Sequence, residues 1–144
     1  MKKLTIILFF FAFLISFSQT KTKFFSENDI MYIDSLATFK TKTFLLKNGL
    51  DEFKEVKISM NSTKESLKNI TIQKLNMIIQ TANSKTKYTL KNKSTYSPLK
   101  IFVAFMENEW TIIIDYTAQN DYGANKDGKT ITIFNDIGEF KSQL

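Results

Sequence analysis

The chain has 144 residues, a formal net charge of +6 and 43% hydrophobic residues, which suits one domain large enough to bury a core without disulfides. It contains no cysteine, no histidine and no arginine, so all 20 of its basic residues are lysines. This composition excludes zinc sites built from nitrogen and sulfur ligands, Ser-His-Asp and Cys-His nucleophilic centres, and the bidentate arginine grip on phosphates.

The first 18 residues have the pattern of a cleaved secretory signal. Lys2 and Lys3 precede an apolar run over residues 4–15, and the small residues Ser16 and Ser18 follow it. The run is shorter than the roughly 17–25 apolar residues that span a bilayer. We expect cleavage after Ser18, which predicts an exported protein, periplasmic or extracellular, with no stable membrane anchor.

The segment after a short polar arm predicts a helix over about residues 27–40. Ser26 can cap its first turn, and Ile30, Ile33 and Ala37 recur on one face at helical spacing. Residues 44–47 precede Asn48-Gly49 and leave two interpretations open. They either end this helix or form a strand that enters a hairpin turn.

A strand and a second helix are predicted next. Val56, Ile58 and Met60 alternate with polar residues, which indicates a half-buried strand over about residues 52–60. Residues 64–82 contain the clearest amphipathic pattern of the chain. Its apolar stripe is Leu67, Ile70, Leu75, Ile78 and Ala82, and its polar face is Asn69, Gln73, Asn76 and Gln80.

The rest of the chain predicts strands. A short edge strand is expected at residues 88–90. Residues 99–106 are apolar on both faces, which is typical of a central, covered strand. A tight turn then leads into residues 110–117, where Trp110 shares the core face with Ile112 and Ile114. A final strand is expected over residues 129–134.

This order of elements predicts an α+β fold in which two helices pack on one face of a mainly antiparallel, curved sheet. Residues 19–144 are expected to form one domain. Cystatin-like and nuclear-transport-factor-like folds are similar in architecture, and the similarity is limited to that plan.

The predicted loop over residues 119–128 is the candidate binding site, because functional residues are frequent on loops held by rigid elements. It is longer than the two to five residues of favoured hairpin loops. Tyr122 is its only large aromatic side chain, and the alternative to recognition is that this ring folds back over the core. The candidate ligand- or partner-binding residues are Asn120, Asp121, Tyr122, Asn125 and Asp127.

No metal, cofactor or catalytic residue is predicted. Asn125, Asp127 and Gly128 partly match an acidic calcium loop, but Gly123 and Phe134 stand where its first carboxylate and its bidentate glutamate belong. Nucleic acid is a poor partner, because the lysines are dispersed and no arginine can read guanine.

These observations predict a small, exported, non-catalytic binding module. Its partner is a protein, with an inhibitor or immunity-type role included, or a small ligand. The alternative is a carboxylate-dependent hydrolase of cell-wall or polysaccharide sugars, which needs two facing carboxylates about 5–10 Å apart. Residues 21–100 carry 15 lysines and seven acids, whereas residues 107–144 carry three lysines and seven acids. That asymmetry suits electrostatic steering of a partner, although solvated lysine faces are its simpler explanation.

Overall fold

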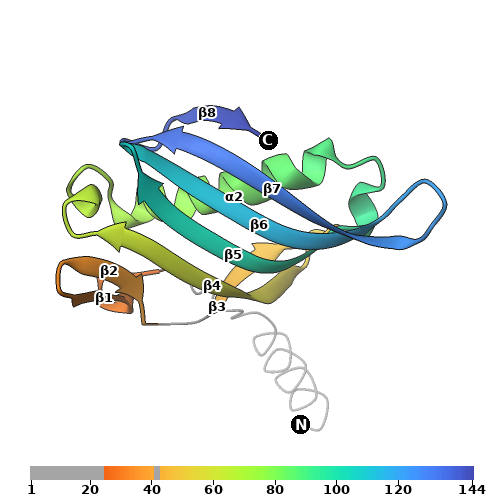
Figure 1. Cartoon of the computed structure of the whole chain (residues 1–144). Helices are drawn as coiled ribbons and strands as arrows, with labels where there is room; N and C mark the ends of the chain where they lie inside the picture. Colours follow the sequence, from red (N-terminus) through yellow and green to blue (C-terminus); the bar gives the residue numbers. More distant parts are fainter. Residues whose placement is uncertain (1–24, 41–42) are drawn as a thin grey trace, which may run out of the picture.

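One long helix lies across one face of an eight-stranded, mostly antiparallel sheet in the described part of the chain (Figure 1). The computed structural model describes residues 25–40 and 43–144, so the expected signal lies outside the described residues. The elements in chain order are η1 (Glu27–Asp29), β1 (Ile30–Ile33), β2 (Leu36–Phe39), β3 (Thr43–Lys47), β4 (Phe53–Thr63), η2 (Ser66–Lys68), α2 (Ile72–Thr89), η3 (Lys93–Thr95), β5 (Ser97–Met106), β6 (Glu109–Gln119), β7 (Asn125–Asn135) and β8 (Phe140–Gln143).

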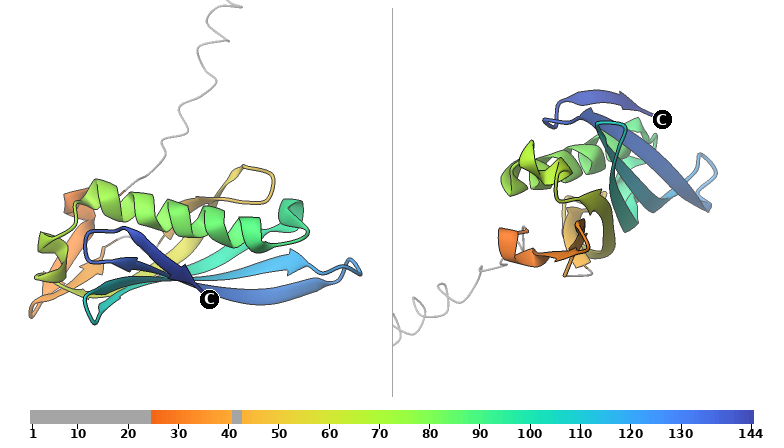
Figure 2. Two further views of the ribbon diagram at one scale, coloured as in Figure 1. Left: turned by 90° about the horizontal axis from the view of Figure 1, so that it is seen from above. Right: turned by 60° about the vertical axis from the view of Figure 1, so that its left-hand side comes forward.

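The sheet is open and has the strand order β1-β2-β4-β5-β6-β7-β8, with β3 paired to β4 beside this path. The β4–β5 pair is parallel, and the other strand pairs are antiparallel. Figure 2 shows the sheet twisting beneath α2, which covers only one of its faces. The α+β prediction is confirmed, but one α-helix, instead of the predicted two, packs on the sheet among the described residues.

The central strands carry the core on the face that α2 covers. Trp110, Ile112 and Ile114 of β6 are fully buried, as are Ile101 and Val103 of β5. All five belong to one cluster with the apolar stripe of α2. The predicted strands over residues 99–106, 110–117 and 129–134 are therefore confirmed, with β6 and β7 extending further. Residues 99–106 are central as predicted, but described elements cover only one of their two faces.

The helix predicted over residues 27–40 is wrong. Only Glu27–Asp29 forms a 3-10 turn, and β1 and β2 then make a hairpin. Asp34 and Ser35 form its two-residue turn with φ of 47° and 71°, the left-handed geometry that matches the twist of a hairpin. β-Branched and aromatic residues such as Tyr32 and Ile33 favour this extended conformation. Residues 44–47 lie in β3.

The amphipathic helix exists, but it begins eight residues later than predicted, at Ile72 instead of residue 64. Thr71 is its cap, because its hydroxyl accepts a hydrogen bond from the Lys74 amide at 3.1 Å. Leu75 and Ile78 are buried as expected, whereas Asn76 of the predicted polar face is buried too. Its side chain bonds the amide and carbonyl of Phe25, at 3.2 and 2.9 Å.

The edge strand predicted at residues 88–90 is also wrong, because α2 continues to Thr89. The buried face of the last turns of α2 is polar, with Asn83 and Thr86 at 2% and 0% exposure. Asn83 donates to the Lys47 carbonyl at 3.0 Å and accepts from the Tyr96 hydroxyl at 2.8 Å. A buried face that is polar removes the hydrophobic periodicity by which such a helix is recognised.

Candidate functional site

The loop predicted over residues 119–128 is shorter than expected. β6 and β7 stay in register up to the pair Gln119 and Asn125, so only residues 120–124 form the turn. The two strands project beyond the sheet body at this end (Figure 1), where neither face of the ribbon has to be apolar. The polar sequence that indicated a loop is therefore strand. The ribbon requires glycine at position 128, because a Cβ atom there would lie 2.4 Å from the Tyr116 ring.

The turn is held by the side chain of Asn120. Its Oδ1 atom accepts hydrogen bonds from the amides of Tyr122 and Ala124, both at 3.0 Å. The Asn120 amide donates to the Ala124 carbonyl at 2.9 Å, which closes the turn. Gly123 has a φ of +77°, a conformation that glycine adopts without strain. These hydrogen bonds account for the tight backbone geometry of the turn.

The connection between α2 and β5 supports this hairpin from one side. Asn92 donates its side-chain amide to the Gln119 and Asn120 carbonyls at 3.2 and 2.9 Å. The Gln119 amide donates to the Thr95 hydroxyl at 2.9 Å. Lys91 and Asp121 form an ion pair at 2.6 Å. These contacts tie the projecting turn to the body of the protein.

Tyr122 is 93% exposed, so its ring covers no part of the core. Asn120, Asp121 and Tyr122 lie together in the turn. Asn125 and Asp127 lie instead on β7, opposite Gln119 and Thr117. The structure therefore divides the five predicted residues into a turn and the strand beside it. We call residues 120–124 the hairpin tip.

Register places a charged row across the outer face of the sheet, the face opposite α2. Lys57 of β4 pairs with Lys100 of β5, which pairs with Asp115 of β6, which pairs with Lys129 of β7. We call these four residues the cationic row. The Asp115 Oδ1 atom is buried without a hydrogen-bond partner among the described residues, and the Lys129 ammonium lies 3.7 Å from it.

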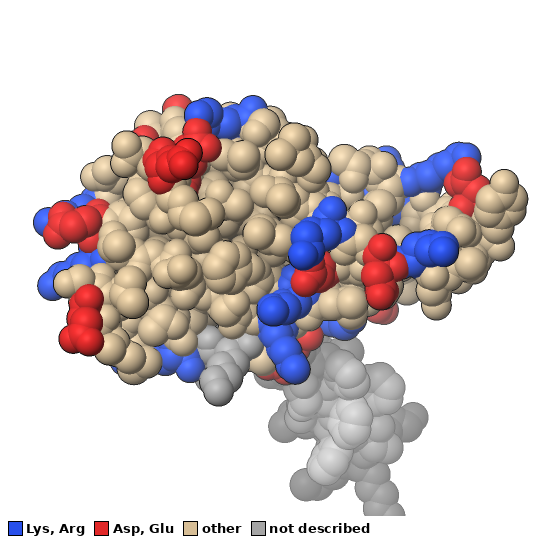
Figure 3. Space-filling model, viewed as in Figure 1, with Lys and Arg blue, Asp and Glu red and all other residues tan. Residues whose placement is uncertain are grey.

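The next two rows of the outer face carry no charged side chain. The first contains Ser59, Phe102, Ile113 and Ile131, and the second contains Asn61, Ala104, Thr111 and Ile133. We call the six residues of these rows that lie on β5, β6 and β7, of which all but Thr111 are apolar, the apolar panel. Figure 3 shows this uncharged surface, bordered by a charged band on the side of the hairpin tip. Sequence reasoning missed both features, because they arise only when four strands are aligned.

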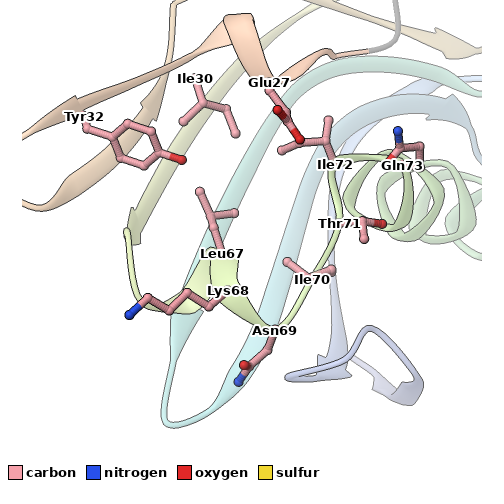
Figure 4. A pocket seen from close by; sticks show the side chains of 10 residues that line it. All are labelled: Glu27, Ile30, Tyr32, Leu67, Lys68, Asn69, Ile70, Thr71, Ile72 and Gln73. Atoms are coloured by element: carbon pink, nitrogen blue, oxygen red, sulfur yellow. The ribbon is translucent and has the colours of Figure 1, made fainter.

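A cleft of about 500 Å³ lies between the N-terminal hairpin and the start of α2 (Figure 4). Ile30 and Leu67 face it with the Tyr32 ring, and Glu27 supplies its single carboxylate. Lys68 lines it too, but its ammonium is paired with Glu65 at 2.6 Å. The cleft does not hold the two facing carboxylates that a glycoside hydrolase needs.

The described residues contain no group of three or more acidic, histidine or cysteine side chains placed to hold a metal ion. Among the same residues, no helix has the length and apolar character needed to cross a membrane. Comparison of the chain with protein-family models, with curated proteins and with solved structures gives no match.

Proposed function

We propose that this protein is a small, exported, non-catalytic binding module that recognises a protein partner through its hairpin tip. The observation that carries the proposal is Tyr122, which is 93% exposed at the end of a projecting ribbon. Tyrosine is enriched at binding hot spots, where it supplies a large contact area for few rotatable bonds. A ring that contacts only solvent does not stabilise the fold, which favours a role in recognition.

The shape of the tip supports a protein partner over a small ligand. Small-molecule sites are concave and enclose most of the ligand. The tip is convex and projects from the body (Figure 1), so it fits into a partner's depression. An inhibitor or immunity-type role belongs to this proposal. We also propose that the fold has the cystatin-like or nuclear-transport-factor-like plan, because a helix across an antiparallel sheet is common to those folds.

The bonds of Asn120 and Asn92 support the proposal energetically. A loop that is ordered before it binds loses less conformational entropy on association. The tip has this property, since its backbone is tied to its own side chain and to the η3 segment. Export fits the signal pattern of residues 1–18, and mass spectrometry of the native protein is expected to find Gln19 at the N-terminus.

Photo-crosslinking in the producing cells tests the recognition role. A photoreactive aromatic residue at position 122 is expected to give one discrete protein adduct. The matched control is position 88, because Tyr88 is also well exposed, at 68%, but lies at the end of α2. Adduct formation should be lost when Asp121→Ala is added. Equal adducts from both positions, or none from position 122, contradict the proposal.

A further inference from the structure

We propose that the outer face of the sheet is a second interaction surface, which docks an acidic amphipathic helix of a partner protein. The apolar panel would receive the apolar stripe of that helix, and the cationic row would face its carboxylates. This inference is independent of the hairpin tip, because it involves other residues on the sheet body. It rests on register, burial and charge.

The apolar panel is unusual for a sheet face that no described element covers. Antiparallel sheets with one solvated face alternate between apolar and polar residues. β4 follows that rule, with Glu55, Lys57 and Ser59 on its outer face. β5, β6 and β7 do not, since Phe102, Ile113, Ile131 and Ile133 lie there half-buried. Large contiguous apolar patches on a soluble protein mark interaction sites.

The net positive charge of the cationic row indicates that the partner is negatively charged where it contacts this row. It holds three lysines against one aspartate, a balance of +2. Asp115 is flanked by Lys100 and Lys129, so only part of the positive charge is neutralised within the row. The acids Glu55 and Asp127 lie on the same face, one row further from the panel. A partner that carries carboxylates at one edge of an apolar stripe complements this arrangement. Complementary charge would also steer the encounter and fix its orientation.

A second copy of the chain fits the face less well. A symmetric pair would have to place each cationic row against an acidic group of the other copy. Glu109 stands at the opposite end of this face, but its carboxylate is already paired with Lys141. The apolar panel itself contains no acid. A panel packed on a second panel brings no acid against either cationic row, which favours a different, acidic protein.

A helix fits the panel better than a strand does. The backbone groups of β5, β6 and β7 are bonded to their neighbours there, so an added strand finds no free edge. The opposite face of the same strands already packs a helix, α2 (Figure 2). A helix about 10–12 Å across spans two to three strands spaced about 4.8 Å apart. This matches the width of the panel.

A binding titration with defined peptides tests the proposal. The probe is a labelled helical peptide of about 18 residues, five turns, with a leucine stripe flanked by glutamates. A second peptide has lysines in place of the glutamates. Fluorescence anisotropy with the purified protein should show salt-sensitive binding of the acidic peptide, and binding about tenfold weaker or absent for the basic one. Equal binding of the two peptides, or no binding of either, overturns the proposal.

Variants locate the binding. Lys100→Glu combined with Lys129→Glu should weaken the acidic peptide at least about tenfold. Lys126→Glu is the matched control, because Lys126 lies on β7, the strand of Lys129, but its side chain is on the opposite face of the sheet. Ile131→Thr should also weaken binding while preserving strand propensity, and thermal melting checks its fold. Unchanged affinity in the lysine double variant overturns the proposal.

Two further measurements separate this inference from its alternatives. Tyr122→Ala should leave peptide affinity unchanged, so failure at the tip and failure at the panel are distinguishable. Sedimentation should show a monomer. A dimer that dissociates on Ile131→Thr would assign the panel to a second copy of the chain and would overturn the proposal.

Discussion

The two faces of strands β5, β6 and β7 differ in burial, although both carry apolar side chains and successive residues alternate between them. On the inner face, Trp110, Ile112 and Ile114 have 0% exposure beneath α2. On the outer face, Phe102, Ile113 and their neighbours are half-buried beside a row of lysines. Apolar side chains therefore specify the fold on one face and remain available on the other. Hydrophobic alternation alone does not distinguish the two uses.

The largest effect is expected from emptying the inner face. Trp110→Ala removes a fully buried ring and the Nε1 hydrogen bond to the Asp136 carbonyl at 3.2 Å. It should lower the free energy of unfolding by about 3–5 kcal/mol, as measured by urea denaturation. Ile113→Val on the outer face should lower it by no more than about 1 kcal/mol. A loss above about 1.5 kcal/mol for Ile113→Val would mean that the outer face is core as well.

The helix that covers the inner face should show the same contrast. Ile78→Ala is expected to destabilise the protein by about 2–5 kcal/mol, because Ile78 is buried against the sheet. Gln73→Ala on the exposed side of α2 should change stability by at most about 0.5 kcal/mol. Similar losses at both positions in thermal or chemical denaturation would contradict this description of α2.

A smaller effect is expected at the polar end of the inner face. Tyr96→Phe removes the hydroxyl that donates to Asn83 Oδ1 at 2.8 Å and leaves that buried oxygen unsatisfied. The expected loss is about 1–3 kcal/mol. Burial also raises the pKa of Tyr96 above its ordinary value of 10.0.

Because the fold favours the neutral phenol, its contribution is complete below pH 10 and is lost as pH rises above the unfolded-state pKa. The difference in unfolding free energy between the wild type and Tyr96→Phe should therefore shrink in alkali. A difference that grows with pH would contradict this account. Denaturant titrations from about pH 8 to pH 11 measure it.

The smallest effect on stability is expected at the hairpin tip. Tyr122→Ala should change the free energy of unfolding by less than about 0.5 kcal/mol, because the ring contacts solvent. Asn120→Ala serves as the comparison and should cost about 1 kcal/mol, since two amides lose their acceptor. A sharp drop in melting temperature for Tyr122→Ala would show that the ring stabilises the fold.

The central sheet could be predicted from sequence because each of its strands carries a local signal. A run that is apolar on both faces identifies β5, and alternation identifies β6. The tight turn between them is confirmed, with Glu107 and Asn108 at φ of 52° and 61°. The N-terminal hairpin could not be predicted. Ile30, Ile33 and Ala37 happen to have helical spacing, and the Asp34-Ser35 turn lacks the usual glycine.

The sequence did not predict the first residue of α2, because both the segment around Ser66 and Thr71 offer a side chain that can cap the helix. Ser66 interacts with the preceding strand, where its hydroxyl donates to the Thr63 carbonyl at 2.6 Å and contacts Ser62 Oγ at 3.0 Å. These bonds hold residues 63–66 outside the helix and leave Thr71 as the cap. Local hydroxyl bonding that competes with a helix is invisible to periodicity.

The candidate site was predicted in part. Exposure of Tyr122 follows from its polar, glycine-containing surroundings, but the support from Asn92 joins residues far apart in sequence. The cationic row and the apolar panel need the register of four strands, which no single segment contains. Long-range alignment is the information that the chain alone did not provide.

For the recognition that we propose at the hairpin tip, the two hydrogen bonds accepted by the Asn120 side chain have a consequence for the association rate. These two hydrogen bonds fix the tip before any partner arrives, so no loop folding has to precede or follow the encounter. A partner that engages Tyr122 should therefore associate in a single kinetic phase whose rate rises linearly with concentration. Asn120→Ala would release the turn and should add a slower, concentration-independent step to the same reaction.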